Sequence, residues 1–463
     1  MSKVSITFLG AAETVTGSRF LVEFEDKKVL VEAGLFQGLK ELRLKNWDPF
    51  PVDPSSIDAV IISHAHLDHC GYVPLLVKAG FNKNIYSTEN TLKLAEVILN
   101  DSARIQMEDA KYALKKGFSK HNPPKPLYDE SDVNKTLSKF KTIKFRSKTE
   151  ILKNVFITFY PAGHILGAAF ILLEIGGENL LFTADLGRNQ HPILVSPDPI
   201  PDIEISALIT ESTYGARVHE SPIENFTNAI NKTINRGGSI LIPAFAVDRT
   251  EVILIRLREL MDQNLIPRVP IYVDSPMALS SLKHYRNAVS NSDTEIRLSF
   301  IADYKNQDPF DPQTIKEMKT VEESMKLNNP AHSCIIVSAS GMATGGRVVH
   351  HLKNMLPNPI HTVLLVGYQA IGTRGHALVT GAEQIKMHGG MVDVKAEIVK
   401  VEGFSVHADG SELIQWFKKG KSPKNVFIVH GELESSVIFA QRLESELKWK
   451  PIIPKPSQKF EIN

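Results

Sequence analysis

One stretch of the sequence decides the fold: Ile57-Asp-Ala-Val-Ile-Ile-Ser63, followed directly by His64-Ala-His-Leu-Asp-His69. The first seven residues are typical of a buried strand, and residues 71–79 favour a helix. The three histidines and the aspartate therefore lie on a loop that joins a strand to a helix. Imidazole nitrogens and carboxylate oxygens are the usual ligands of a catalytic zinc site. On a tight loop, the first two histidines can face one metal ion while the aspartate and the last histidine face a second.

Two metal ions need further ligands, and the chain offers them in other places that suit the role. Strand-like runs end at His164 and at Asp185, and His407 lies in a third polar segment near the C-terminus. A single histidine at a strand end is usually an ordinary polar residue. The clustered motif together with three such partners is better explained by a metal centre, with Asp185 as the natural bridge between the ions.

Composition narrows the class of protein. The chain has 463 residues, which suggests two domains, and its formal net charge of +1 gives no global field that would attract a polyanion. Any nucleic acid must therefore be held locally. Two distant cysteines argue against a disulfide framework and fit a reducing cytosol. We expect a cytoplasmic protein without a leader peptide or membrane helix, because no run approaches ~18 apolar residues.

From about residue 206, strand-like and helix-like segments alternate along the sequence. Strands are expected near 207–210, 239–242, 269–273, 333–337 and 362–366, with helices near 222–236, 248–263 and 347–355. Such alternation favours a parallel sheet flanked by helices. Because His407 would complete the first site, this second domain is expected to be inserted into the first. The expected boundaries are 1–208 and 385–463 for the first domain and 209–384 for the insert.

The order of the motifs resembles the metallo-β-lactamase superfamily, and in particular its β-CASP branch of RNA-processing nucleases, which includes the nuclease subunit of the pre-mRNA cleavage and polyadenylation factor. Besides the histidine cluster, the resemblance rests on Glu211-Ser-Thr-Tyr-Gly215, Pro243-Ala-Phe-Ala-Val247, Ser340-Gly-Met-Ala-Thr-Gly-Gly-Arg347, Gly372-Thr-Arg-Gly-His376 and Gly403-Phe-Ser-Val-His407-Ala-Asp409. It implies an α/β protein: an αββα sandwich with an inserted β-CASP domain, whose parallel sheet is flanked by helices.

The resemblance also implies roles for residues. His64, His66 and His164 would hold one zinc ion, Asp68, His69 and His407 the other, and Asp185 both. The catalytic residues would be Asp68, Glu211 and His376, with the last two positioning the scissile phosphate or protonating the leaving oxygen. A histidine at position 407 is similar to the RNA-cutting members, whereas DNA-cutting members carry an aliphatic residue there.

The inserted domain is expected to contact the substrate. The Gly-rich turn that includes Ser340 and Gly341 can offer backbone amides to phosphate, or it can be a purely structural turn. The guanidinium groups of Arg249, Arg347 and Arg374 have donors in the geometry that phosphate oxygens accept, although each alone is more often a salt-bridge partner.

Two segments depart from the family pattern, and one histidine near the C-terminus, His430, is given only a supporting role. Glu32 stands where relatives usually have aspartate, which predicts a displaced hydrogen bond and reduced activity. Asp248-Arg-Thr-Glu251 replaces Gly-Arg-x-Gln, and Asp248 can simply cap a helix. His430 is expected to donate a hydrogen bond to the metal loop.

The leading hypothesis is a ribonuclease with two zinc ions, in which a metal-bridging hydroxide hydrolyses the phosphodiester bonds of RNA. Internal cleavage is the expected mode, RNA is the expected partner, and a homodimer is the expected assembly. Two alternatives stay open: a metallo-hydrolase of a small ester or thioester, and a weakly active RNA-binding homologue.

Overall fold

The computed structural model describes residues 3–116, 123–219, 221–305 and 307–462. The chain forms two compact units, one from Met1–Val218 together with His407–Asn463 and the other from His219–Val406. Each unit has its own sheets and its own core. No helix in the described ranges combines the length and the apolar character that a membrane crossing needs.

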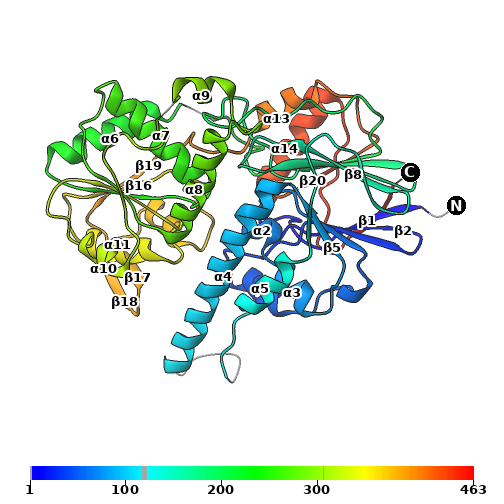
Figure 1. Cartoon of the computed structure of the whole chain (residues 1–463), viewed down its shortest axis with the longest axis horizontal. Coiled ribbons are helices and arrows are strands. Elements are labelled where there is room, and N and C mark those ends of the chain that lie inside the picture. Colours follow the sequence, from blue (N-terminus) through cyan, green and yellow to red (C-terminus); the bar gives the residue numbers. More distant parts are fainter. Residues whose placement is uncertain (1–2, 117–122, 220, 306, 463) are drawn as a thin grey trace. The chain divides into compact units, whose positions relative to one another are not determined.

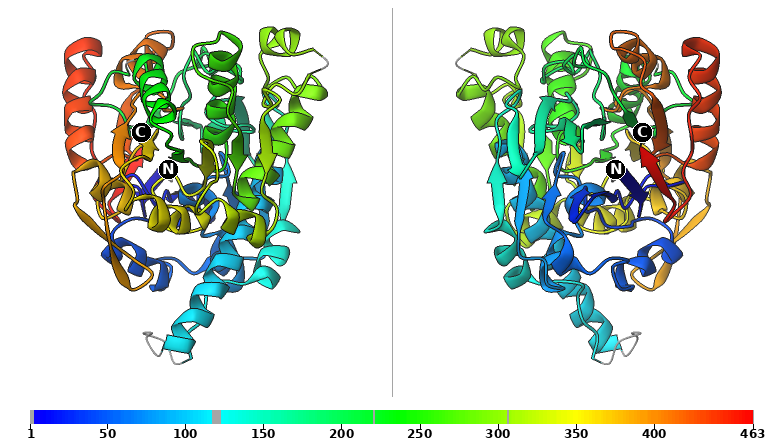
Figure 2. Two further views of the ribbon diagram at one scale, coloured as in Figure 1. Left: turned by 90° about the vertical axis from the view of Figure 1, so that its left-hand side faces the viewer. Right: turned by 90° about the vertical axis from the view of Figure 1, so that its right-hand side faces the viewer.

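Two sheets form the first unit. One has the order β21-β1-β2-β3-β4-β5-β6 and the other the order β20-β11-β10-β9-β8-β7. Their bounds are β1 Val4–Phe8, β2 Phe20–Phe24, β3 Lys27–Val31, β4 Ala59–Ile61, β5 Asn84–Ser87, β6 Phe140–Thr142, β7 Thr149–Leu152, β8 Val155–Pro161, β9 Ala169–Ile175, β10 Glu178–Phe182, β11 Ala207–Glu211, β20 Asn425–Val429 and β21 Lys459–Ile462. Figure 2 shows β21 in red beside β1 in dark blue, the two strands that pair antiparallel.

The core of this unit lies between its two sheets. Alternate residues such as Ile6 and Val22 from one sheet pack with Ile157 and Ile171 from the other, and all are fully buried. The helices on the side of the first sheet are α1 Lys40–Leu44, α2 Leu67–Cys70, α3 Val73–Lys78, α4 Glu89–Lys116 and α5 Glu130–Leu137. The helices on the side of the second sheet are α13 Gly410–Phe417 and α14 Leu433–Leu447. This is the expected αββα sandwich.

The second unit contains a sheet in the order β14-β13-β15-β12-β16-β19, and every pair in it is parallel. Its strands are β12 Ile240–Pro243, β13 Ile271–Val273, β14 Ile315–Glu317, β15 Ile335–Ser338, β16 Thr362–Leu365 and β19 Glu397–Lys400, and a hairpin adds β17 Gln384–Met387 and β18 Gly390–Asp393. Helices α6 Ile223–Asn235, α7 Arg249–Asp262 and α8 Pro276–Ser290 cover one face. Helices α10 Val321–Lys326 and α11 Arg347–Met355 cover the other (Figure 1). Two short helices, α9 Leu298–Asp303 and α12 Arg374–Val379, complete the unit.

The second unit begins and ends later in the sequence than the expected insert at 209–384. Strand β11 pairs in parallel with β10 and with β20, so residues 207–211 belong to the first unit. Strand β19 pairs with β16, so residues 397–400 belong to the second.

Candidate metal centre

The side chains of the centre follow the ends of strands that run parallel. Strand β4 ends at Ile61, just before the histidine cluster, and it pairs in parallel with β3. In the other sheet, β10, β11 and β20 run parallel and are followed by, or end at, Asp185, Glu211 and His430. Because parallel strands bring their carboxyl ends to one edge, side chains far apart in the sequence converge there.

The first group of ligand atoms contains three histidines and one aspartate. The Nε2 atom of His64 lies 3.1 Å from Nδ1 of His66, and Nε2 of His164 lies 3.3 Å from the same nitrogen. Asp185 Oδ2 lies 3.4 Å from His64 Nε2 and 3.6 Å from His164 Nε2. All four ligand atoms lie within 4.8 Å of one another. Three nitrogens and one carboxylate oxygen thus converge on a single point, as the ligands of a metal ion do.

Burial keeps these imidazole rings neutral. Loss of solvent is the main cause that lowers the pKa of His64 to about 4 and that of His66 to about 3. The same effect, reinforced by His407, lowers the pKa of His164 well below its ordinary value. Neutral rings leave lone pairs free to bind a cation at neutral pH, which is the protonation state a metal ligand requires.

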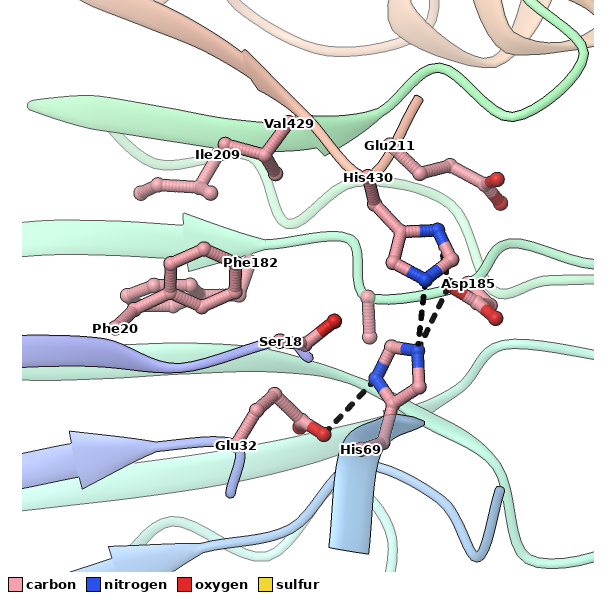
Figure 3. Close-up of a pocket in the computed structure, with 11 residues that line it drawn as sticks. Ser18, Phe20, Glu32, His69, Phe182, Asp185, Ile209, Glu211, Val429 and His430 are labelled. Atoms are coloured by element: carbon pink, nitrogen blue, oxygen red, sulfur yellow. Dashed lines mark hydrogen bonds and ion pairs between the residues drawn. The ribbon is translucent and has the colours of Figure 1, made fainter. Parts of the chain in front are cut away.

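The second group contains Asp68, His69 and His430. His69 Nε2 lies 3.2 Å from His430 Nε2, and the latter nitrogen lies 3.5 Å from Asp68 Oδ2. Asp185 reaches this group with its other oxygen, since Oδ1 lies 3.4 Å from His69 Nε2 and 3.4 Å from His430 Nδ1 (Figure 3). The carboxylate of Asp185 therefore turns one oxygen toward each group.

The carboxylates of the centre stay ionised despite their burial. Burial alone would raise the pKa of Asp68, but the hydrogen bond from His430 and the charge of His69 outweigh it and lower that pKa. Nearby histidines likewise lower the pKa of Asp185 well below its ordinary value. Burial opposes a charge on His69 as well, yet Asp185 and Glu32 together raise the pKa of that ring.

A second layer of residues orients the ligands. Glu32 lies just after β3, and its Oε2 lies 3.0 Å from His69 Nδ1 while its Oε1 accepts the Ser63 N–H at 2.8 Å. Thr213 Oγ1 lies 3.0 Å from Nδ1 of His430. Such contacts fix the rotation of a ligand ring. The longer side chain of Glu32 reaches both the histidine ring and the loop, so the geometry gives no sign of the displaced hydrogen bond that the sequence suggests.

A small cavity of about 10 Å³ lies beside the second group, with polar residues along one side and apolar residues along the other (Figure 3). The apolar side is formed by Phe20, Phe182, Ile209 and Val429. Apolar walls keep the local dielectric low, which strengthens the attraction between the ligands and a cation.

The donor set fits a divalent metal. Asp185 Oδ1 is buried, and the described residues provide it with no hydrogen bond, so a cation would supply its missing partner. Nitrogen and carboxylate donors in this number suit zinc, while neither thiol is near enough to contribute a ligand in the groups found. The described residues therefore contain a His/Asp cluster that can hold metal.

His407 occupies a different position from the one expected. Its segment pairs with Gly187, and its Nδ1 lies 3.1 Å from Glu211 Oε2, whereas its Nε2 is 3.9 Å from Asp185 Oδ2. It belongs to none of the ligand groups found among the described residues. His430 instead joins Asp68 and His69. The sequence held a usable signal, because His430 directly follows a buried strand just as the first cluster does.

The residues expected to contact substrate lie in the second unit. Arg347 Nη1 donates to Asp274 Oδ1 at 2.6 Å and to the Met318 carbonyl at 2.9 Å. The guanidinium of Arg249 is buried and donates to the Val366 carbonyl. Both side chains thus hold the fold of the unit itself.

The Gly-rich turn is part of the same unit. Ser340 Oγ accepts the Thr344 N–H, and the Gly341 carbonyl accepts a hydrogen bond from Gln369 Nε2 at 3.1 Å. Arg374 donates to two carbonyls of this turn. His376 lies in α12, outside the unit that carries the metal ligands, and its expected catalytic role stays a prediction.

Comparison with known proteins agrees with this architecture. Models of three families match the chain: the metallo-beta-lactamase superfamily domain at residues 21–202, the Beta-Casp domain at 250–378 and the Zn-dependent metallo-hydrolase RNA specificity domain at 391–454. A solved structure of a protein of unknown function from Enterococcus faecalis covers 99% of this chain with a TM-score of 0.53 at 13% identity. That likeness concerns the fold alone.

Curated relatives align along almost the whole chain. Ribonuclease TTHA0252 of Thermus thermophilus is 32% identical over 94% of both proteins, and the RNase J-like protein of Methanocaldococcus jannaschii is 31% identical over 97% of this chain and 98% of its own. Cleavage and polyadenylation specificity factor 73 of Drosophila melanogaster is 29% identical over 92% of this chain and 59% of its own. On these matches and on its fold, the chain belongs to the β-CASP branch of the metallo-β-lactamase superfamily, a family of metal-dependent hydrolases.

Proposed function

We propose that this protein is a ribonuclease that works with two zinc ions. The observation that carries the proposal is the carboxylate of Asp185, whose Oδ2 faces one group of histidines and whose Oδ1 faces the other. A carboxylate that bridges two ligand groups is the arrangement of a two-metal hydrolase. His64, His66 and His164 would hold one ion, and Asp68, His69 and His430 the other.

Zinc ions in such a centre activate a water molecule for attack and stabilise negative charge on a phosphate oxygen. Burial keeps His64, His66 and His164 neutral, nearby histidines keep Asp68 and Asp185 ionised, and bulk water is excluded from most of the centre. His64, His69 and His164 have side chains that are at most 2% exposed, so little rearrangement of solvent accompanies the reaction.

His407 and Glu211 are proposed as the acid that completes the cleavage. The side chain of His407 is 16% exposed, more than the buried ligands, and Glu211 lies against its Nδ1. Glu211 is itself fixed, because its Oε1 accepts the Leu186 N–H at 2.6 Å. A carboxylate on one ring nitrogen orients the ring and stabilises its protonated form, from which Nε2 can pass a proton to the leaving oxygen. This role was expected for His376 and is here assigned to His407.

RNA is the proposed substrate because two relatives that align over at least 94% of both chains are named a ribonuclease and an RNase J-like protein, and the C-terminal match is to an RNA specificity domain. The test is cleavage of end-labelled single-stranded RNA, with matched DNA and a small ester or thioester substrate alongside. RNA cleavage that disappears in Asp68→Ala/His69→Ala supports the proposal. Hydrolysis of the small substrate alone, or no hydrolysis by zinc-loaded protein, would contradict it.

The same experiment addresses the mode of cleavage. Internal cleavage, the proposed mode, gives a ladder of labelled fragments, whereas terminal cleavage gives mononucleotides or a single shortening series. A homodimer in the cytoplasm remains the proposed state of the protein, and sedimentation of the purified chain tests its assembly.

A further inference from the structure

Arg19 is a buried arginine whose guanidinium lies in a cage of aromatic rings. Its residue is 4% exposed, and its guanidinium carbon lies 3.9 Å from the centre of the Tyr72 ring, 4.7 Å from that of Phe36 and 5.9 Å from that of Phe50. Its Nη2 donates to Asn46 Oδ1 at 3.1 Å. Neutral groups therefore surround the charge.

A cation in such a place is energetically costly. Within the described residues no carboxylate lies within salt-bridge distance of this guanidinium, and burial lowers the pKa of Arg19 to about 10. Aromatic faces offset part of the cost of removing a cation from water. An apolar side chain of similar length would fill the space without that cost, so packing alone does not account for the charge.

The backbone that Arg19 holds is the backbone that carries Asp68. Nε of Arg19 donates to the Gly34 carbonyl at 2.8 Å, and the Gly34 N–H donates to the Ser18 carbonyl at 2.9 Å. The Ser18 N–H in turn donates to the Asp68 carbonyl at 2.8 Å. The two loops touch directly, because a Cβ atom on Gly34 would lie 1.6 Å from the Asp68 carbonyl oxygen.

The wall of the cage is joined to the same loop. The Tyr72 N–H donates to the Ala33 carbonyl at 2.7 Å, and the Ala33 N–H donates to the His69 carbonyl at 2.8 Å. Ala33 also follows Glu32, whose carboxylate contacts the His69 ring. A shift of this loop would therefore move both the backbone of His69 and the carboxylate that orients its ring.

Resting on the metal centre proposed above, we propose that Arg19 is a positioning residue for Asp68 and His69. It touches no ligand atom and acts through Gly34, whose loop it clamps against α2. The flat, forked guanidinium serves this purpose because it stacks on Tyr72 while donating to two acceptors in different directions. Lysine has neither the plane nor the fork, so it cannot replace arginine here.

The test is a titration of metal-free protein with Co²⁺, followed by visible absorbance, for the parent, Arg19→Lys and Arg19→Met. In the variants the first equivalent is expected to bind as in the parent, because the hydrogen bonds of Ala33 and Gly34 lead to the backbone of His69 and Asp68 and not to that of His64, His66 or His164. The second equivalent is expected to bind about 10–100-fold more weakly, as the loss of an orienting contact commonly does. With zinc, kcat should fall while KM for RNA stays unchanged.

The matched control is Arg258→Lys in the second unit. Arg258 is 8% exposed, its guanidinium carbon lies 4.7 Å from the centre of the Tyr304 ring, and it donates to Gln307 Oε1 and to the Asp308 carbonyl. This variant removes a similar buried, stacked guanidinium and should leave both equivalents of Co²⁺ unchanged.

The outcomes separate the two proposals. If Arg19→Lys weakens the binding of both Co²⁺ equivalents equally, or weakens the binding of neither, the positioning role is overturned. If Arg19→Met does not fold, the result for Arg19→Lys alone decides. A parent protein that binds fewer than two Co²⁺ ions would overturn the two-metal centre itself, and the role of Arg19 with it.

Discussion

At the scale of single residues, the two histidines late in the chain differ in their surroundings. The side chain of His430 is 6% exposed, and its Nε2 points at other ligand atoms. That of His407 is 16% exposed and is held by Glu211. A metal ligand needs convergence with its neighbours, whereas a proton donor needs a partner that orients it and access to the leaving group.

This difference predicts opposite results for two alanine variants. His430→Ala should reduce bound zinc from two ions per chain to about one, because three donors of the second group become two. His407→Ala should keep both ions and lower kcat by about 10²–10⁴-fold, the usual contribution of a general acid. Elemental analysis together with RNA cleavage rates tests both. Loss of one zinc ion in His407→Ala would instead show that His407 is a ligand, as the sequence suggested.

The sequence points to members of the two groups where they are clustered or follow strands, as His64, His164 and Asp185 do, and the structure brings these side chains together. The choice between His407 and His430 was harder: His430 directly follows a buried strand, which is a usable signal, but the sequence does not show which of the two histidines reaches the second group. Only the parallel pairing of β20 with β11 brings one of them to the second group. Arg19 had no sequence signal either, because its aromatic cage is assembled from separate loops.

Glu32 supports a second prediction at this scale. In Glu32→Asp the carboxylate is one methylene shorter and cannot reach both His69 Nδ1 and the Ser63 N–H. Zinc affinity, measured by competition with a chelator, should fall about 10–100-fold. Glu32→Gln is the matched variant, because its amide oxygen can still accept the Ser63 N–H. Unchanged affinity in Glu32→Asp would show that the ring of His69 needs no partner.

At the scale of elements, the long apolar strands and amphipathic helices follow the sequence closely. The expected strands near 207–210, 239–242 and 362–366 appear as β11, β12 and β16, and the expected helices appear as α6, α7 and α11. Strands β14 and β19 were not predicted, because their residues are only half-buried or exposed and show no apolar run. Such edge strands form through pairing with a neighbour that is already in place.

Helix α7 contains a buried carboxyl group that makes stability depend on pH. Burial, with the nearby charge of Asp248, raises the pKa of Glu251 well above its ordinary value, and Ser281 Oγ donates to its Oε1 at 2.9 Å. The folded state therefore keeps this proton after the unfolded state has lost it. Stability must fall as the pH rises above the ordinary pKa of a glutamate and toward the raised pKa of the folded state.

Glu251→Gln removes this dependence, because an amide does not ionise in either state. The variant should melt at the same temperature as the parent near pH 4.5 and about 2–4 °C higher at pH 8 for each 1 kcal/mol gained. Thermal melts at several pH values test this. A difference that does not grow with pH would contradict it.

At the scale of the whole molecule, the proposed metal ligands all belong to the first unit. A ligand stabilises only the unit that binds it, so chelation of the metal should lower the melting temperature of the first unit alone. Calorimetry with and without EDTA is expected to show two transitions, of which one moves. The other transition, that of the second unit, is identified by its higher melting temperature in Glu251→Gln at pH 8. Equal shifts of both transitions on chelation would show that the units unfold together.

The sequence predicted an inserted domain but not where it begins and ends. Residues near 209 form a strand like those that follow them, and only its pairing with β10 and β20 assigns it to the first unit. At the other end, β19 lacks the apolar pattern of a central strand. Pairing partners, which are set by tertiary contacts, therefore decide both boundaries.

The first unit is built from two separated parts of the chain, Met1–Val218 and His407–Asn463. During translation, β11 cannot pair with β20, and β1 cannot pair with β21, until the ribosome has made the whole second unit. His430 directly follows β20, so it too is made after the second unit. A nascent chain therefore lacks the proposed ligand His430 until the second unit has been made, and it is expected to be unable to cleave the messenger that is being translated.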